Sequence, residues 1–251
     1  MIPFLKDNYI RPSGEGNSFK VDIDKIKQPF GNLYEESVLA AEEIYSLKEG
    51  KLHVMYSGGL DSEYVLSVFH HLGMEIKPVI VRLMPDYNDF DTKYAFDFCK
   101  QHRINPVVVD IDFKWFVESG EHLETAVNMK SSMYHYCATA YAMGKIDGSI
   151  LLGEGQIQVD FNKQTRRWMF EIDERDYVFV NYMKMYGIDG TPFFDRWRPG
   201  MLASSMLDPY IKALGNNQIP EHTTSDDGKV EMYNRHSPFK LEPRPKYSRV
   251  S

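Results

Sequence analysis

Six consecutive residues have the types and the spacing of a phosphate-binding turn: Ser57, Gly58, Gly59, Leu60, Asp61 and Ser62. The apolar run at 52–56 predicts a buried strand before them, and apolar residues at helical spacing predict a helix over 64–72. Glycines in such a turn let the backbone approach a ligand closely, and the helix N-terminus supplies unpaired N–H groups. The turn therefore predicts an anion site for phosphate, in preference to a turn whose side chains only cap a helix.

The polar side chains of this turn indicate which other groups the anion site needs. Ser57 and Ser62 offer hydroxyl donors to a phosphate, whereas Asp61 would repel it. A carboxylate is well placed there if a hard cation such as Mg²⁺ lies between it and the phosphate oxygens. We therefore expect Mg²⁺ in the site, with Asp61 as its protein ligand. The turn is not a Walker A loop, because the sequence contains no G-x-x-x-x-G-K-[ST].

The segment SGGLDS at 57–62 resembles the pyrophosphate loop (PP-loop) of the N-type ATP pyrophosphatases. This superfamily includes asparagine, GMP, NAD and argininosuccinate synthetases and several tRNA-modifying enzymes. The resemblance implies ATP and Mg²⁺ as cofactors, and cleavage of ATP to AMP and pyrophosphate. The loop would hold the departing pyrophosphate, with Ser57 and Asp61 as catalytic residues. A substrate oxygen would attack the α phosphate, and a second nucleophile, often ammonia, would then displace AMP.

A second segment, Leu151 to Gly155, resembles the end of the fourth strand in asparagine synthetases, and it implies that Gly153 and Glu154 lie beside the adenylate. In those enzymes an Asp-Glu pair follows, whereas here the chain continues with 156–160 and lacks the pair, which argues against aspartate as the substrate. The glutaminase domain and its N-terminal cysteine are also absent, so we expect ammonia to be free or to come from a partner protein. The resemblance, closest to the C-terminal domain of asparagine synthetase, covers about residues 34–160.

Strand-like and helical patterns alternate from residue 51 to residue 155. Buried strands are predicted at 52–56, 76–83, 107–111 and 149–152, with helices over 33–48, 64–72, from 91 onward and over most of 115–143. Strands apolar on both faces are typical of parallel sheets covered by helices. We therefore predict an α/β fold with a doubly wound parallel sheet, and the resemblance implies the adenine nucleotide alpha-hydrolase-like (HUP) type.

In such sheets ligands bind at the carboxyl ends of the strands, near a switch point. The SGGLDS turn, the segment after Val81 and the segment from Gly153 should therefore converge. The resemblance implies that groups just after the second strand hold the adenine, and Arg82 is the candidate there.

Beyond residue 156 the predicted alternation stops, and we divide the chain into an N-terminal extension (1–33), a PP-loop domain (34–160) and a mainly helical substrate-recognition extension (161–251). Lys163, Arg166 and Arg167 are the candidate cations for the triphosphate, with Lys163 as the catalytic candidate; otherwise they form a solvated face. A rigid loop is expected at 191–194, and short helices at 199–207 and 209–214. The basic tail, the last 17 residues, carries Arg235, Lys240, Arg244, Lys246 and Arg249. It is either a solvated strap or a clamp for an anionic group.

Composition excludes several other classes of protein. A net charge of −7 disfavours a broad nucleic-acid-binding surface, and no apolar run is long enough to span a membrane. The first residues do not resemble a signal peptide, and two cysteines indicate a reducing compartment, so we expect a cytoplasmic protein. Cys99 and Cys137 are expected as buried apolar fillers, too few for a four-cysteine zinc site. The histidines 70, 71, 122 and 135 are expected in surface or capping roles.

Three functions remain open on the sequence. The first is an AMP-forming, ATP-dependent ligase that adenylates the carboxylate or carbonyl oxygen of a small molecule before amination or ligation. The second is a PP-loop enzyme that modifies a nucleobase or tRNA. The net charge of −7 argues against this function, whereas the basic tail favours it. The third is a non-catalytic ATP-binding module, which the intact SGGLDS segment disfavours. The oligomeric state cannot be read from the sequence.

Overall fold

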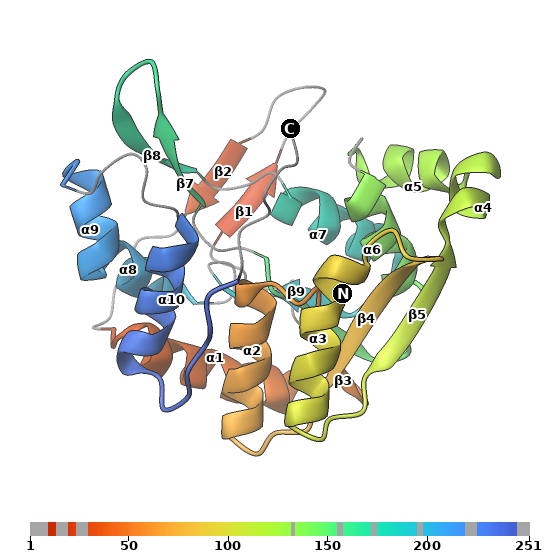
Figure 1. Ribbon diagram of the computed structural model, residues 1–251, viewed down its shortest axis with the longest axis horizontal. Helices are drawn as coiled ribbons and strands as arrows, with labels where there is room; N and C mark the ends of the chain where they lie inside the picture. The colour runs from red at the N-terminus through yellow and green to blue at the C-terminus, as the bar shows by residue number, and fades with distance from the viewer. Residues whose placement is uncertain are drawn as a thin grey trace.

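The computed structural model describes residues 10–13, 20–23, 30–131, 134–154, 158–171, 175–194, 198–218 and 225–244. Its centre is a five-stranded sheet in the order β5-β4-β3-β6-β9, in which all neighbours run parallel (Figure 1). The strands of this sheet are β3 (Leu52–Met55), β4 (Lys77–Met84), β5 (Val107–Asp112), β6 (Ser149–Leu152) and β9 (Gly190–Pro192). Two antiparallel pairs lie outside it: β1 (Ile10–Ser13) with β2 (Lys20–Ile23), and β7 (Gln158–Asn162) with β8 (Arg167–Glu171).

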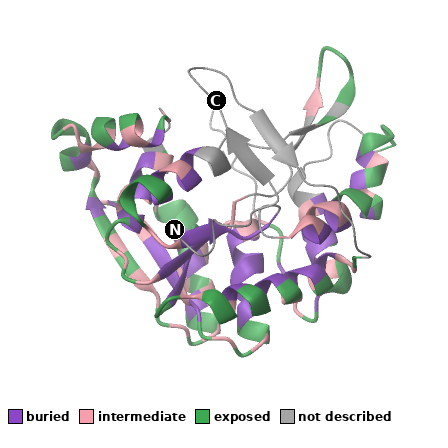
Figure 2. Ribbon diagram, turned by 180° about the vertical axis from the view of Figure 1, so that it is seen from behind, coloured by how far each residue is buried: buried purple, intermediate pink, exposed green. Residues whose placement is uncertain are grey.

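Helices cover both faces of the central sheet. Their bounds are α1 (Leu33–Leu47), α2 (Leu60–His71), α3 (Asp89–Gln101), α4 (Phe113–Glu118), α5 (Glu121–Met129), α6 (Tyr134–Met143), α7 (Arg175–Tyr186), α8 (Pro199–Leu207), α9 (Pro209–Gly215) and α10 (Ser225–His236). Successive strand residues point to opposite faces, so Val54 packs in a core with α1, α2 and α3. Its neighbour Met55 packs in a second core with α6 and α7. Buried residues gather on the sheet and on the helix faces turned toward it (Figure 2).

The strand order creates a switch point between β3 and β6. From β3 the chain adds β4 and then β5 on one side, whereas β6 and β9 lie on the other side. Crevices at the carboxyl ends of strands form where the order reverses in this way. The turn after β3 and the segment after β6, which carry the two motifs, therefore lie on either side of the crevice.

The predicted α/β fold with a parallel, helix-covered sheet is confirmed. The predicted strands at 52–56, 76–83, 107–111 and 149–152 correspond to β3, β4, β5 and β6, with ends that differ by one residue at most. The helix predicted over 33–48 is α1, which begins with a capping box between Asn32 and Glu35. The two short helices predicted beyond residue 198 are α8 and α9.

The prediction of a loop at 191–194 was wrong, because Gly190–Pro192 forms β9, the fifth strand of the sheet. Its residues pair with β6, with Thr191 beside Leu151, and the side chain of Thr191 is fully buried. A proline argues against a central strand because it lacks an N–H donor, but β9 is an edge strand and tolerates one. Three residues are also too few to reveal a strand pattern. The sheet therefore includes a strand beyond residue 156, where the sequence suggested that the alternation ends.

The β7–β8 hairpin was not predicted, although its turn has a clear local cause. The side-chain oxygen of Asn162 accepts hydrogen bonds from the backbone N–H groups of Gln164 and Thr165, both at 3.0 Å. An asparagine that bonds its own following backbone in this way favours a turn. Of the predicted N-terminal extension, residues 1–9, 14–19 and 24–29 lie outside the described residues.

Within the described ranges, no helix combines the length and the apolar character that crossing a membrane requires.

One carboxyl group at the amino end of the sheet predicts a pH dependence of stability. Asp189 accepts a hydrogen bond from the Ser149 hydroxyl, and burial raises the pKa of Asp189 above its ordinary value of 3.8. The folded state therefore holds this proton more tightly than the unfolded state, so the free energy of unfolding falls as the pH rises above 3.8. We expect Asp189→Asn to raise the melting temperature near neutral pH and to flatten its decline between about pH 4 and pH 7.

The matched control for this prediction is Asp147→Asn, an exposed aspartate near the same end of the sheet. Thermal melts of both variants and of the parent across that pH range make the comparison. A neutral-pH melting temperature that falls in Asp189→Asn, with the control unchanged, would contradict the prediction.

Candidate functional site

The turn between β3 and α2 is built as the sequence predicted, with its glycines at the bend. Gly58 has a φ of +86°, which a glycine adopts without strain, and Gly59 is the extended N-cap residue of α2. No side chain caps this end of α2. The Ser57 hydroxyl accepts a hydrogen bond from the Gly59 N–H at 3.2 Å, and the Ser62 hydroxyl lies 3.4 Å from it. Two hydroxyls and the start of a twelve-residue helix thus meet at one point.

The same turn is tightly enclosed by its neighbours. A Cβ atom at Gly58 would lie 2.4 Å from the carbonyl oxygen of Asp91, at the start of α3. A Cβ atom at Gly153 would lie 2.7 Å from the Cα atom of Ser62, so the end of β6 lies directly against the first turn of α2. Only glycine allows both approaches, and the two motif segments are therefore in contact.

Asp61 is bound by two side chains of α10. The Lys229 ammonium lies 3.0 Å from Oδ2 of Asp61, and the Tyr233 hydroxyl donates to Oδ1 at 2.6 Å. The Tyr233 ring is held by stacking on Tyr64 of α2, with ring centroids 4.3 Å apart. The side chain of Lys229 is only 16% exposed and that of Asp61 is 28% exposed. A cation from the last fifth of the chain therefore lies beside the glycine turn.

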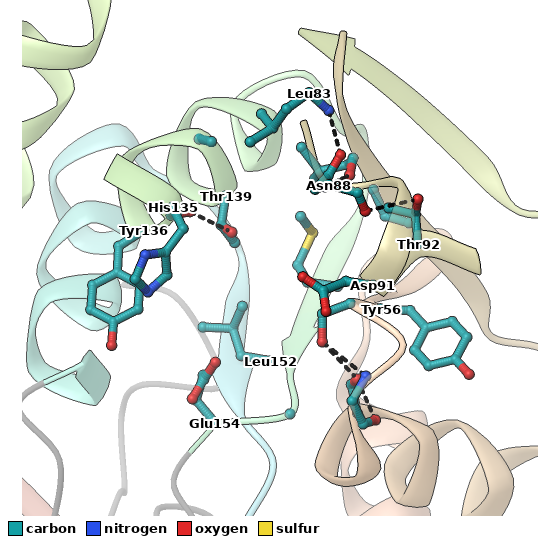
Figure 3. Close-up of a pocket in the computed structure, with 18 of the residues that line it drawn as sticks. Tyr56, Leu83, Asn88, Asp91, Thr92, His135, Tyr136, Thr139, Leu152 and Glu154 are labelled. Atoms are coloured by element: carbon teal, nitrogen blue, oxygen red, sulfur yellow. Dashed lines mark hydrogen bonds between the residues drawn. The ribbon is translucent and has the colours of Figure 1, made fainter. Parts of the chain in front are cut away.

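A cavity of about 850 Å³ opens beside this turn at the carboxyl edge of the sheet. Its floor is apolar and comes from residues at the strand ends, among them Met55, Val79, Val81, Leu83 and Leu152. Figure 3 shows Asn88, Asp91 and Thr92 on one side of the cavity and His135, Thr139 and Glu154 on the opposite side. Ser57, Asp61 and Ser62 line the same cavity. A large cavity with an apolar floor and converging polar groups is typical of a small-molecule site.

The Asn88 side chain forms hydrogen bonds with two backbone groups near the end of β4. β3 ends at Met55, so the edge of β4 beyond Val79 has no strand beside it on the cavity side. The Asn88 side chain accepts from the Leu83 N–H and donates to the Val81 carbonyl, both at 2.8 Å. Two backbone groups beside the segment where the resemblance implies adenine are therefore already hydrogen-bonded to this amide.

The structure brings together some of the predicted residues and separates others from them. Ser57, Gly59, Asp61, Ser62, Gly153 and Glu154 line the cavity, whereas Gly58 and the buried Leu60 do not. Arg82 forms an exposed ion pair with Asp110 of β5, 2.7 Å apart, and is not among the residues that line the cavity. Lys163, Arg166 and Arg167 are exposed at the turn of the β7–β8 hairpin, and none of them lines the cavity either.

Sequence reasoning missed Lys229 and Tyr233. Both lie in a stretch whose composition is polar and without a motif, and they are four residues apart, which places them on one face of α10. That spacing is common to many exposed helices and carries no functional signal by itself. The basic tail was considered as a clamp, and one of its residues, Arg244, donates to the carbonyl oxygen of Gly58 at 2.9 Å.

The cysteines occupy the positions expected of apolar fillers. Cys99 and Cys137 are both buried, and burial raises the pKa of Cys99 to about 11. Burial also raises the pKa of Cys137. Thiols with raised pKa values are poor nucleophiles at neutral pH. Across the part of the chain that the structure describes, no three histidine, cysteine or acidic side chains are grouped so as to hold a metal ion by themselves.

Comparison of the chain with protein-family models and with curated proteins finds no match.

Proposed function

We propose that this protein is an AMP-forming, ATP-dependent ligase of the ATP pyrophosphatase type, with the PP-loop fold that the SGGLDS segment implies. One observation carries the proposal. The uncapped start of α2, the Asp61 carboxylate and the Lys229 ammonium meet at the switch point of a parallel sheet, beside a cavity of about 850 Å³. Helix N-termini and lysine ammonium groups both bind phosphate.

The residues at the turn fit a polyphosphate with its cation. Gly58 lets the turn pack against α3, and Gly153 lets the end of β6 pack against α2, so that Ser57, Gly59 and Ser62 are held at the wall of the cavity. Asp61 offers the single carboxylate of the turn, and Mg²⁺ usually takes one or two protein carboxylates and completes its shell with phosphate oxygens and water. Asp61 would hold the ion, whose positive charge would offset the charge that builds up on pyrophosphate as it leaves.

The protein residues would then act by binding and positioning. Lys229 would exchange its contact with Asp61 for a phosphate oxygen of ATP, and Ser57 and Ser62 would donate hydroxyl hydrogen bonds to the same group. The apolar floor of the cavity would exclude water from the α phosphate. An acceptor oxygen held near Glu154 could attack the α phosphorus as the bond to pyrophosphate breaks, and an amine or ammonia would displace AMP in a second step.

A nucleobase as acceptor is the second candidate, and the aromatic lining of the cavity favours it. Tyr87, Phe113, Tyr136 and Phe179 all contribute to the walls, and planar heterocycles stack on such rings. A ring carbonyl would then receive the adenylyl group in place of a carboxylate. We place the reaction in the cytoplasm, since the protein would use cellular ATP and its two cysteines are free and buried.

The test is ATP–pyrophosphate exchange with Mg²⁺, measured across pools of amino acids, keto acids, nucleosides and tRNA. We expect exchange that depends on one pool, because adenylation is reversible only when the acceptor is present. Binding of ATP without exchange or AMP formation in any pool would favour the non-catalytic module.

Lys229→Met is expected to lower this exchange by about 100-fold, because it removes one preorganised charge from the phosphate site. Lys163→Met is the matched control, since Lys163 is exposed on the β7–β8 hairpin and does not line the cavity. We expect the control to exchange at the parental rate. Equal rates in the two variants would remove Lys229 from the proposed site and return the hairpin cations to consideration.

A further inference from the structure

The chain after α10 returns along α2 and ends its described course at the glycine turn (Figure 1). Its path is held by reciprocal hydrogen bonds between Asn234 and Leu241: the Leu241 N–H donates to the Asn234 side chain at 2.8 Å, and that side chain donates back at 2.9 Å. The Leu241 side chain is buried in the core beneath. Residues 237–244 are therefore an ordered part of the fold, and they deliver Arg244 to one place.

Besides a contact of 3.4 Å to the Glu242 carbonyl in its own segment, Arg244 makes three contacts there. Its Nε donates to the carbonyl oxygen of Gly58 at 2.9 Å, its guanidinium forms an ion pair with Glu63, and it lies 5.0 Å from the centre of the Tyr94 ring. The side chain is 19% exposed, whereas that of Glu63 is 7% exposed. Glu63 also accepts a hydrogen bond from the Tyr56 hydroxyl at 2.6 Å. A carboxylate this buried needs a charged partner, and Arg244 supplies it.

The bond to Gly58 has a consequence for the turn. Glycine moves readily between backbone conformations, so the turn's own sequence does not hold Gly58 at a φ of +86°. The carbonyl of Gly58 and the N–H of Gly59 belong to one planar peptide and point in opposite directions. Fixing that carbonyl on Arg244 therefore directs the Gly59 N–H to the other side, where it meets the Ser57 hydroxyl that lines the cavity.

We propose that Arg244 is a positioning residue, which Glu63 holds in place and which fixes the glycine turn in the conformation that binds phosphate. The C-terminal segment would thereby be part of the nucleotide site without touching the nucleotide. This inference rests on the proposed function for its effect on ATP, but its structural half stands alone. A guanidinium can donate to the carbonyl and to the carboxylate at the same time, whereas a lysine ammonium lacks that fork.

The experiment uses two test variants, the single change Arg244→Lys and a double variant that combines Glu63→Gln and Arg244→Ala. Lys240→Ala is the control. The double variant avoids leaving a buried carboxylate unpaired. Lys240 is the matched control because it lies in the same segment and donates to the Asn234 carbonyl, away from the turn. Hydrogen exchange is measured without nucleotide at the two amides of the turn that carry hydrogen bonds, Gly59 to the Ser57 hydroxyl and Glu63 to the Gly59 carbonyl. The melting temperature and the kinetics of ATP–pyrophosphate exchange are measured beside it.

We expect Arg244→Lys to keep most of the parental melting temperature but to lose amide protection in the turn. The kcat of ATP–pyrophosphate exchange should fall by about 100-fold in this variant, as for a reactive group displaced by about 1 Å. The double variant should show the same losses, and Lys240→Ala neither. Parental protection of the turn in both Arg244 variants would overturn the inference, whatever the result with ATP. If the parent protein fails to bind ATP while the turn still loses protection, the proposed function fails and the positioning role stands.

Discussion

Asp61→Asn is expected to lower ATP–pyrophosphate exchange by about 10³-fold. Asparagine has the shape of aspartate and can still accept the hydrogen bond from Tyr233. It lacks the charge that orients Lys229, 3.0 Å away, and the charge that a Mg²⁺ ion requires of its ligand. The effect should therefore appear in exchange and in MgATP affinity.

The fold should survive the same change, because asparagine keeps the shape of the side chain and the hydrogen bond from the Tyr233 hydroxyl. Asp97→Asn makes the same chemical change on the exposed side of α3 and is the matched control. Exchange by Asp61→Asn within a few-fold of the parent and of this control would show that the carboxylate has no role in the reaction.

Gly58→Ala is expected to abolish nucleotide binding and to destabilise the fold. The left-handed backbone at Gly58 costs alanine about 1–2 kcal/mol. The new methyl group would also lie 2.4 Å from the Asp91 carbonyl oxygen and 3.1 Å from the Ala95 nitrogen, which are backbone atoms of α3. Such crowding typically costs about 1–3 kcal/mol more, and relieving it must move either the turn or α3.

The control variant Gly73→Ala separates the backbone cost of alanine from the cost of steric crowding. Gly73, just beyond the other end of α2, has a φ of +66°, and a Cβ atom there would meet nothing within 4 Å. It should therefore incur only the backbone cost and keep parental affinity for MgATP. Urea denaturation and MgATP titration of both variants make the measurement. Equal losses of stability in the two, with nucleotide binding intact in Gly58→Ala, would mean that the enclosure of the turn has no functional importance.

Much of the central sheet could be predicted from the sequence because its signals are local. The strands at 52–55 and 149–152 are apolar except for His53 and Ser149, since both faces of the sheet are covered. β9 was missed for the opposite reason: three residues that include Pro192 show no period, and the strand exists because β6 offers an edge to pair with. Pairing energy from a distant segment decided its conformation, and no local pattern reports that.

The same division runs through the candidate site. Ser57, Gly58, Gly59, Asp61 and Ser62 could be named from the sequence, because a strand-to-helix turn is made by neighbours in the chain and its chemistry lies in those few residues. Their fit to Gly153 also followed, since parallel strands bring their carboxyl ends to one edge. Which lysine or arginine side chain lies beside the turn could not be predicted in this way. Lys163, Arg166 and Arg167 are grouped in a basic patch, yet they lie exposed on a hairpin, whereas Lys229 comes from a stretch without any motif.

The sequence by itself determined the glycine turn, for which we propose phosphate binding, and the parallel sheet that presents it, because both depend on short-range backbone geometry and on apolar periodicity. The tertiary structure alone decided which distant side chains complete the turn. Lys229 and Tyr233 reach Asp61, and Arg244 reaches Gly58, across separations of more than 160 residues. Such contacts depend on how α10 and the chain after it pack against α2. That packing is spread over many buried side chains, and no single one of them indicates in the sequence which residue it will contact.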